Sequence, residues 1–135
     1  MPPMVLVDSN VLLDVITADP VWGNWAEDTL IRLFDKNILA INPIIYAEVS
    51  IRFSTIEELE ETISPSFFER LPVPYEAAFL AGKCYMKYKE RGGTKTSVLP
   101  DFLIGAHASV SNMRLVTRDI SRYKTYFPKL ELITP

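Results

Sequence analysis

The first segment of the chain, residues 4–14, constrains the fold more than any other. Met4–Val7 is a short apolar run of the kind that forms a buried parallel strand, and a helix-like segment follows it directly. Asp8 stands where that strand should end. Ligands in open α/β sheets bind outside the carboxyl ends of the strands, although Asp is also an ordinary helix N-cap. The segment therefore predicts an α/β fold and makes Asp8 a candidate functional residue.

Apolar runs alternate with helical patterns along the rest of the chain. Further strands are expected at residues 38–41, 71–74 (or an extended connector there), 114–117 and 130–133. Helices are expected at residues 10–16, 21–36, 44–53, from a cap at 54–55 to a break at 64–65, 75–91, and from residue 100 onward. This alternation predicts a parallel sheet covered by helices. Since we find no repeat and no linker, we expect a single domain over residues 1–135.

The composition is that of a soluble globular protein, with 48% hydrophobic and 23% charged residues. No apolar stretch approaches the roughly 20 residues of a membrane span, and the first residues lack the features of a signal peptide. Cys84 is the single cysteine, which suits a reducing compartment. We therefore expect a cytoplasmic protein that does not contact a membrane.

The net charge of -3 is unevenly distributed along the chain. Residues 1–76 hold 13 acids and 4 bases, whereas residues 77–135 hold 4 acids and 10 bases. The basic half could meet a polyanion, although the acidic pI of about 5.2 argues against strong nonspecific binding to nucleic acid. The alternative is that these bases form solvated helix faces.

Glu48 has an unusual setting for an acid. In the helix expected at 44–53, it shares a face with three isoleucines: Ile41, Ile44 and Ile45. An ionised acid without a partner is rarely placed on an apolar face. Either Glu48 pairs with Arg52, four residues on, or it belongs to a site.

Two further acids occupy positions that suggest a site. Asp119 follows the strand at 114–117 much as Asp8 follows the first strand. Asp101 lies in the first turn of the helix that opens at residue 100, on a face with small residues that permits close approach of a neighbour. Each acid could instead be a helix cap or a first-turn acid favoured by the helix dipole.

Convergence of these acids would require either that some of them are protonated or that a cation lies between them. Two carboxylates about 5 Å apart repel by roughly 3 kcal/mol at an effective dielectric near 20. Hard oxygen ligands without a His or Cys cluster favour Mg²⁺ or Mn²⁺ over zinc. The sequence shows no phosphate-binding glycine loop and no Ser–His pair, and His107 is expected to be a structural or surface residue.

Four segments together resemble the PIN domain, and within it the small VapC-type toxins of bacterial and archaeal toxin–antitoxin pairs. They occur in the family's order across almost the whole chain: Val7–Leu13, Tyr46–Val49, Pro100–Ala106 and Val116–Asp119. The resemblance implies a three-layer α/β/α sandwich with a central, mainly parallel sheet. It also implies an Mg²⁺- or Mn²⁺-dependent endoribonuclease that forms a homodimer and is silenced by a cognate antitoxin, whose tail enters the active-site groove.

The resemblance also assigns roles to individual residues. The family's catalytic and metal-binding acids correspond to Asp8, Glu48, Asp101 and Asp119. Its polar helpers, which orient ligands and metal-bound water, correspond to Asn10 and Thr117, with Ser9 assisting. Contacts to the RNA phosphates are expected from Lys95 and Arg118. Asp14 is expected on the helix surface or just behind the site.

Two other functions remain open at this point. A phosphatase of the haloacid-dehalogenase type also begins with an Asp after the first strand, but it needs a second Asp two residues on, where this chain has Asn10. A non-catalytic PIN-fold module that binds a partner protein would need no metal. No base-reading code is legible that would name the RNA.

Overall fold

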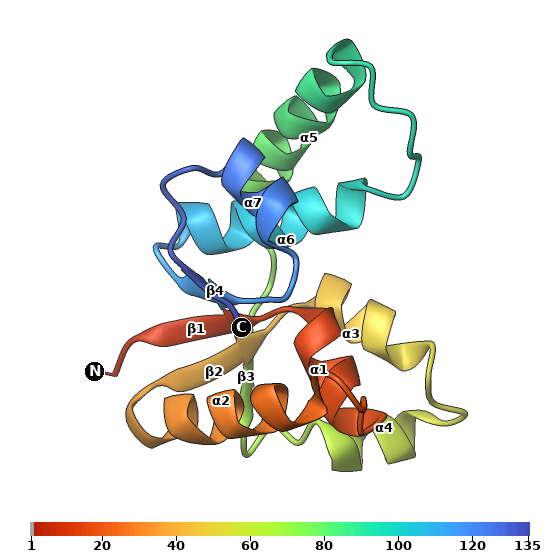
Figure 1. Ribbon diagram of the computed structural model, residues 1–135, viewed down its shortest axis with the longest axis vertical. Helices are drawn as coiled ribbons and strands as arrows, with labels where there is room; N and C mark the ends of the chain where they lie inside the picture. The colour runs from red at the N-terminus through yellow and green to blue at the C-terminus, as the bar shows by residue number, and fades with distance from the viewer. Residues whose placement is uncertain (1) are drawn as a thin grey trace.

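A computed structural model describes residues 2–135, and its centre is a five-stranded parallel sheet (Figure 1). The strand order is β3-β2-β1-β4-β5, and every neighbouring pair is parallel. The strands are β1 (Met4–Val7), β2 (Ile38–Ile41), β3 (Phe68–Arg70), β4 (Arg114–Val116) and β5 (Leu132–Ile133). The first segment of the sequence thus forms the central strand, as its uninterrupted apolar character suggests.

Helices cover both faces of the sheet. The chain forms α1 (Ser9–Ile16), α2 (Gly23–Lys36), α3 (Pro43–Ser50), α4 (Ile56–Thr62), α5 (Tyr75–Glu90), α6 (Leu99–Val110) and α7 (Ile120–Tyr126). Figure 1 shows α1 and α2 on one side of the strands and α5, α6 and α7 on the other. The expected three-layer α/β/α arrangement with a parallel sheet is therefore confirmed.

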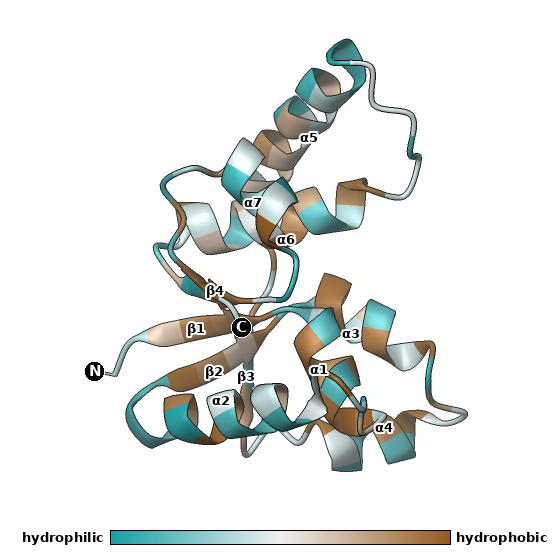
Figure 2. Cartoon of the chain, in the orientation of Figure 1, coloured by the Kyte–Doolittle hydropathy of each residue, from teal (hydrophilic) through white to brown (hydrophobic). Residues whose placement is uncertain are grey.

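The two central strands are apolar because both of their faces are covered. Val5, Leu6 and Val7 of β1 are completely buried, and residues 39–41 of β2 are at most 3% exposed. Figure 2 shows the hydrophobic colour concentrated on these strands, with hydrophilic residues along the outer helices. Burial of this kind is the main favourable term in folding and holds the sheet as a rigid platform.

The edge strand β3 lies earlier in the chain than the strand expected at 71–74. It forms at Phe68–Arg70, and the segment with Pro72 and Pro74 is a connector, which was the alternative. Proline has no N–H to donate to a strand ladder, so the pairing stops as the prolines begin. The Leu71 N–H makes the last bond, to the Ile41 carbonyl at 2.9 Å.

Two helices also differ from expectation. The helix expected at 44–53 ends at Ser50, and the chain then turns through bonds from Arg52 N–H to the Val49 carbonyl and from Phe53 N–H to the Ser50 carbonyl. Helix α7 was not expected. It is only seven residues long, so its sequence carries too little periodicity to stand out.

The parallel strands bring the segments after β1 and β4 together. The Asp8 N–H donates to the Val116 carbonyl at 3.0 Å, and the Thr117 N–H donates to the Ile133 carbonyl at the same distance. Asp8 and Thr117 therefore leave the sheet side by side at its carboxyl edge. Within residues 2–135, none of the helices is long and apolar enough to cross a membrane.

Candidate active site

Asp8 is held at the carboxyl edge of the sheet by donors from three elements. Its side chain caps α1, with Oδ1 accepting the Ser9 N–H at 2.8 Å. Its other oxygen, Oδ2, accepts the hydroxyls of Thr117 at 2.7 Å and Tyr123 at 3.0 Å. Asp8 is 3% exposed. Asp8 therefore both caps α1 and belongs to a polar cluster.

The burial of Asp8 makes its ionised form costly. Burial is the largest cause of a pKa raised from 3.8 to about 6, and the hydrogen bonds from Thr117 and Tyr123 oppose that rise. The negative charges of Asp101 and Glu48 raise the pKa of Asp8 further. A cation near these carboxylates would relieve both penalties.

Asn10 joins the segments that follow β1 and β4. Its Nδ2 donates to Thr117 Oγ1 at 3.3 Å and, at 3.4 Å, to Asp8 Oδ2. Its Oδ1 accepts the Arg118 N–H at 3.2 Å. The structure therefore places Asn10 and Thr117 beside Asp8, in positions from which they can orient it.

Glu48 reaches the cluster from α3 through a serine. Ser9 Oγ donates to Glu48 Oε1 at 2.8 Å, so Ser9 touches two of the acids through its backbone and its hydroxyl. Partial burial is the main cause of a raised pKa at Glu48, the Ser9 bond lowers it, and the charge of Asp101 raises it again. The alternative partner, Arg52, forms no ion pair with Glu48 among the described residues.

Asp101 has a cation as its partner. It lies in the first turn of α6, and Arg122 of α7 donates from Nη1 to its Oδ2 in an ion pair. Burial raises the pKa of Asp101, Arg122 lowers it, Asp119 raises it and Lys95 lowers it. Two positive charges, those of Arg122 and Lys95, and one negative charge, that of Asp119, therefore act on Asp101.

Asp119 takes the N-cap position of α7 without capping the helix through its side chain. Its N–H donates to Thr117 Oγ1 at 3.0 Å, which fixes its backbone against the segment after β4. Its charge acts on Asp101, as the raised pKa of that residue shows. All four predicted acids thus lie within electrostatic reach of at least one other acid of the set.

Among the described residues, the Arg118 side chain pairs with Asp14 and with none of the four acids of the cluster. Its Nε and Nη2 donate to Asp14 at 2.5 and 3.0 Å, and its guanidinium lies 5.6 Å from the centroid of the Trp22 ring. Asp14 is 4% exposed, so this bidentate pair joins α1 to the segment after β4. Asp14 is therefore a buried structural partner of Arg118 and does not lie on the helix surface. Lys95, by contrast, lies on an exposed loop close enough to lower the pKa of Asp101.

Tyr123 and Arg122 were missed because they lie on the unexpected helix α7. Tyr123 is 1% exposed, and burial together with the charges of Asp8 and Asp101 raises its pKa well above 10, so it stays a hydroxyl donor. Gly105 of α6 lets α7 approach, since a Cβ there would lie 3.0 Å from the Tyr123 ring and 2.4 Å from that of Phe127. The small-residue face of α6 was the available signal.

The chemistry of the cluster fits a hard divalent cation, because all four acids offer carboxylate oxygens. Their arrangement is closed, however: within residues 2–135, no three acidic, histidine or cysteine side chains form a group placed to hold a metal ion. Protein donors occupy Asp8, Glu48 and Asp101 instead. A carboxylate that accepts a hydrogen bond keeps lone pairs for a metal, so Asp8 and Glu48 could bind an ion with these bonds in place, whereas Asp101 is paired with the charged Arg122.

His107 is a structural residue, in agreement with the sequence. It is 2% exposed, its Nδ1 lies 3.0 Å from Asn42 Nδ2, and burial lowers its pKa. The Asn42 Oδ1 accepts the Ile45 N–H and caps α3. This bond therefore ties α6 to the start of α3, which positions the helices that carry Asp101 and Glu48.

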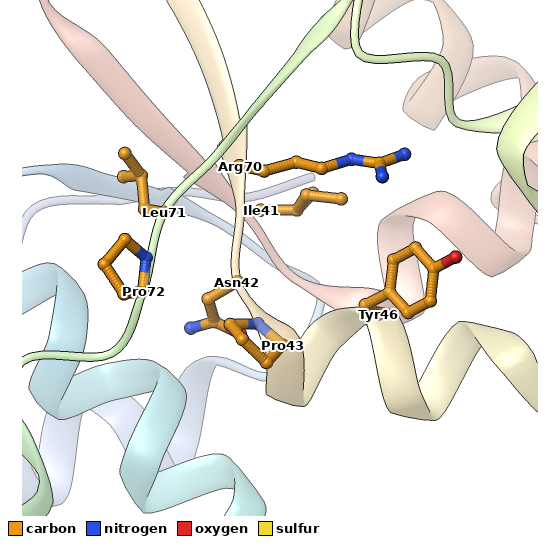
Figure 3. Close-up of a pocket in the computed structure, with 7 residues that line it drawn as sticks. All are labelled: Ile41, Asn42, Pro43, Tyr46, Arg70, Leu71 and Pro72. Atoms are coloured by element: carbon orange, nitrogen blue, oxygen red, sulfur yellow. The ribbon is translucent and has the colours of Figure 1, made fainter.

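A pocket of about 410 Å³ lies beyond the ends of β2 and β3. Its lining is largely apolar (Figure 3): Ile41, Asn42, Pro43, Tyr46, Arg70, Leu71 and Pro72. Tyr46 precedes Glu48 by two residues on α3, so their side chains are about 200° apart around the helix. The pocket therefore opens on the opposite side of α3 from the acids and is not part of the cluster.

Comparison with known proteins supports the fold and identifies the family. The family model described as the PIN domain matches residues 5–128. A chain of VapBC2 from Rickettsia felis, bound to a promoter DNA fragment, is 23% identical with a TM-score of 0.75, covering 98% of each chain. A chain of VapBC-1 from nontypeable Haemophilus influenzae is 18% identical with a TM-score of 0.73, covering 97% of each.

A third similar structure is described as a toxin–antitoxin complex from Klebsiella pneumoniae. Its matching chain is 23% identical with a TM-score of 0.71, and 97% of each chain is covered. No curated protein sequence matches the chain significantly. Similarity at these sequence identities establishes the fold over nearly the full length of the chain. It does not transfer the ligands and partners of those complexes to this chain.

Proposed function

The chain belongs to the PIN domain family, and from that premise we propose that it is a metal-dependent endoribonuclease that hydrolyses RNA phosphodiester bonds. The observation that carries the proposal is the meeting of four acids from separate elements at the carboxyl edge of the sheet: Asp8, Glu48, Asp101 and Asp119. Burial is the main cause of the raised pKa values of Asp8, Glu48 and Asp101, and the charges of neighbouring acids raise them further, as expected where carboxylates are brought together.

The four acids would hold Mg²⁺ or Mn²⁺. Such an ion, when bound, activates water as a nucleophile and neutralises charge on the phosphate under attack. The chain's own part is to position the groups: Thr117, Asn10 and Tyr123 orient Asp8, and Ser9 holds Glu48. One acid of the cluster would accept a proton from the attacking water, and Glu48, which is partly buried and held by Ser9, is our candidate for that role.

We also propose that the protein is the toxin of a toxin–antitoxin pair. The support is the likeness over 97–98% of both chains to chains of VapBC complexes and of a toxin–antitoxin complex. A cognate antitoxin would then silence the enzyme by placing its tail in the groove beside the acids. The toxin would act as a homodimer in the cytoplasm.

A non-catalytic binding module is the second candidate. It is favoured by one observation, the closed arrangement in which protein donors occupy three of the four acids. It predicts neither RNA cleavage nor stabilisation by metal. The phosphatase finds less support, because Asn10 bonds to Asp8 and Thr117 where that chemistry needs an acid, and trapping of a phosphoryl-enzyme would reveal it.

The proposal is tested with purified, antitoxin-free protein and end-labelled total RNA, incubated with Mn²⁺, Mg²⁺ or a chelator. We expect discrete fragments with either metal and none with chelator, together with a higher melting temperature in Mn²⁺. The proposal fails if RNA stays intact and metal leaves the melting temperature unchanged, a result that would favour the binding module. A melting shift without fragments would contradict the RNA substrate and retain the metal site.

A further inference from the structure

Arg122 holds one of the four acids in a direct ion pair. The described residues contain four ion pairs, and of these only Arg122–Asp101 includes Asp8, Glu48, Asp101 or Asp119. The side chains of Arg122 and Asp101 are 20% and 27% exposed, so the pair lies at the surface of the cluster. A group that binds Asp101 from outside must therefore compete with Arg122.

The ion pair of Arg118 with Asp14 is held more firmly than that of Arg122 with Asp101. Arg118 makes two bonds to Asp14, whose side chain is 6% exposed, and lies over the Trp22 ring. Arg122 makes one bond, to an acid that is itself a candidate metal ligand. A single-bond pair with both side chains partly open to water is held less firmly than a bidentate pair to a buried acid. Of the two arginines, Arg122 is therefore the one free to change partners.

We propose that Arg122 changes partners at the active site: it neutralises Asp101 in the cation-free protein and binds an RNA phosphate once a divalent cation takes its place. The inference rests on the proposed function, since it assumes that Asp101 accepts a cation. A divalent cation at Asp101 repels the guanidinium, and an arriving phosphate supplies the negative charge that it has lost. The planar fork of Arg suits a phosphate better than a single carboxylate oxygen.

The helix that carries Arg122 can stay in place during this exchange. Tyr123, the next residue, is anchored by its hydroxyl bond to Asp8 and by its burial against α6. Only the guanidinium of Arg122 therefore has to move. The backbone of Arg122 stays fixed in α7, three residues after Asp119. This geometry places the positive charge of Arg122 at the edge of the acidic cluster. Arg118 cannot bind a phosphate there, because it is paired with Asp14.

The first test measures RNA binding in two states. A fluorescein-labelled single-stranded 12-nucleotide RNA is titrated with wild type, Arg122→Gln and the control Lys124→Gln, in chelator and in Ca²⁺, with RNA integrity checked on a gel. Lys124 is exposed on the same helix and forms no ion pair among the described residues, so its variant matches the charge change.

The expected result is a cation-dependent loss. In chelator, Arg122→Gln and Lys124→Gln weaken RNA binding alike, because each removes one positive charge, whereas in Ca²⁺ Arg122→Gln binds about tenfold more weakly than Lys124→Gln, the loss of one charge-assisted hydrogen bond. Lys124→Gln changes affinity equally in both states. Equal losses for Arg122→Gln in chelator and Ca²⁺ overturn the exchange, as does a wild type that binds the RNA in neither state.

The second test needs no RNA. Calorimetric titration with Mn²⁺ should show several-fold tighter binding to Arg122→Gln than to wild type, because the competing guanidinium is gone, and no change for Lys124→Gln. Weaker Mn²⁺ binding by Arg122→Gln overturns the inference. Arg122→Lys keeps the charge and is the fallback if the glutamine variant unfolds, with a smaller gain in Mn²⁺ affinity expected. A protein that shows both effects but never cleaves RNA would contradict the proposed function and leave the exchange standing.

Discussion

The two ends of the acidic cluster are built differently. Asp8 is 3% exposed and its two oxygens accept neutral donors from its own helix cap, from the segment after β4 and from α7. Asp101 is partly exposed and accepts from a cation, Arg122. Neutral donors orient a carboxylate and leave its charge uncompensated, whereas a guanidinium compensates the charge and blocks the oxygen.

This difference divides the work of the site. The Asp8 end is preorganised by the sheet itself, because parallel strands bring Asp8 and Thr117 together whenever the core forms. The Asp101 end is set by side chains on two helices and can rearrange without cost to the core. We infer that the Asp8 end gives the cluster its position and its need for positive charge, and that the Asp101 end controls access.

The largest predicted difference lies in the pH dependence of stability. Asp8 has a pKa of about 6 in the folded protein against 3.8 as its ordinary value, so its contribution to stability is full below pH 3.8 and is lost as the pH rises through about 6. Between pH 4 and 7, the free energy of unfolding of wild type should fall relative to that of Asp8→Asn by about 2 kcal/mol. Urea unfolding of both proteins across this pH range measures the difference. If the free energies of unfolding of the two proteins depend on pH in the same way, Asp8 does not carry a buried charge.

A smaller effect is expected from the hydroxyl that holds Asp8. Tyr123→Phe removes one buried hydrogen bond and should lower the free energy of unfolding by about 1 kcal/mol. The bond also lowers the pKa of Asp8, so its loss should move the acid limb of Mn²⁺ binding to higher pH. Tyr126→Phe, whose ring packs edge to face against Phe102, is the control. If both variants shift the limb alike, Tyr123 does not act through Asp8.

The smallest effect should come from the other end of the cluster. Asp101→Asn breaks a partly exposed ion pair, so the free energy of unfolding should change by no more than about 1 kcal/mol, with little change of slope between pH 4 and 7 compared with Asp8→Asn. Thermal and urea unfolding of the two variants side by side would show the contrast. The contrast is confirmed if the pH dependence of Asp101→Asn is closer to that of wild type than to that of Asp8→Asn. A loss of several kcal/mol in the free energy of unfolding of Asp101→Asn would make Asp101 a structural residue.

The sequence predicted the parts of this molecule that burial dictates. Met4–Val7 and Ile38–Ile41 are apolar along their whole length because helices cover both faces, and the acids that follow strands or share apolar helix faces came from the same reasoning. The edge strand was placed a few residues late, because prolines at 72 and 74 mark the end of pairing and not its centre.

The contacts that distinguish the two ends of the cluster could not be predicted from local sequence patterns. Tyr123 reaches Asp8 from 115 residues away, and Arg122 pairs with Asp101 through the packing of α7 on α6 at Gly105. Arg118, expected near RNA phosphates, is engaged by Asp14 through a bond across 104 residues. Such partners follow from the tertiary arrangement, and a seven-residue helix gives little periodicity to reveal it.

The most direct test of the account is the rate of RNA cleavage by three proteins that differ by one charge. Wild type, Asp8→Asn and Asp28→Asn are compared in Mn²⁺ at pH 7.5, after equal folding is confirmed by circular dichroism; Asp28 is an exposed acid on α2. The account predicts metal-dependent cleavage by wild type and Asp28→Asn, and a loss of at least a hundredfold in Asp8→Asn, about 2.7 kcal/mol of barrier. Cleavage by Asp8→Asn at the rate of Asp28→Asn would contradict it.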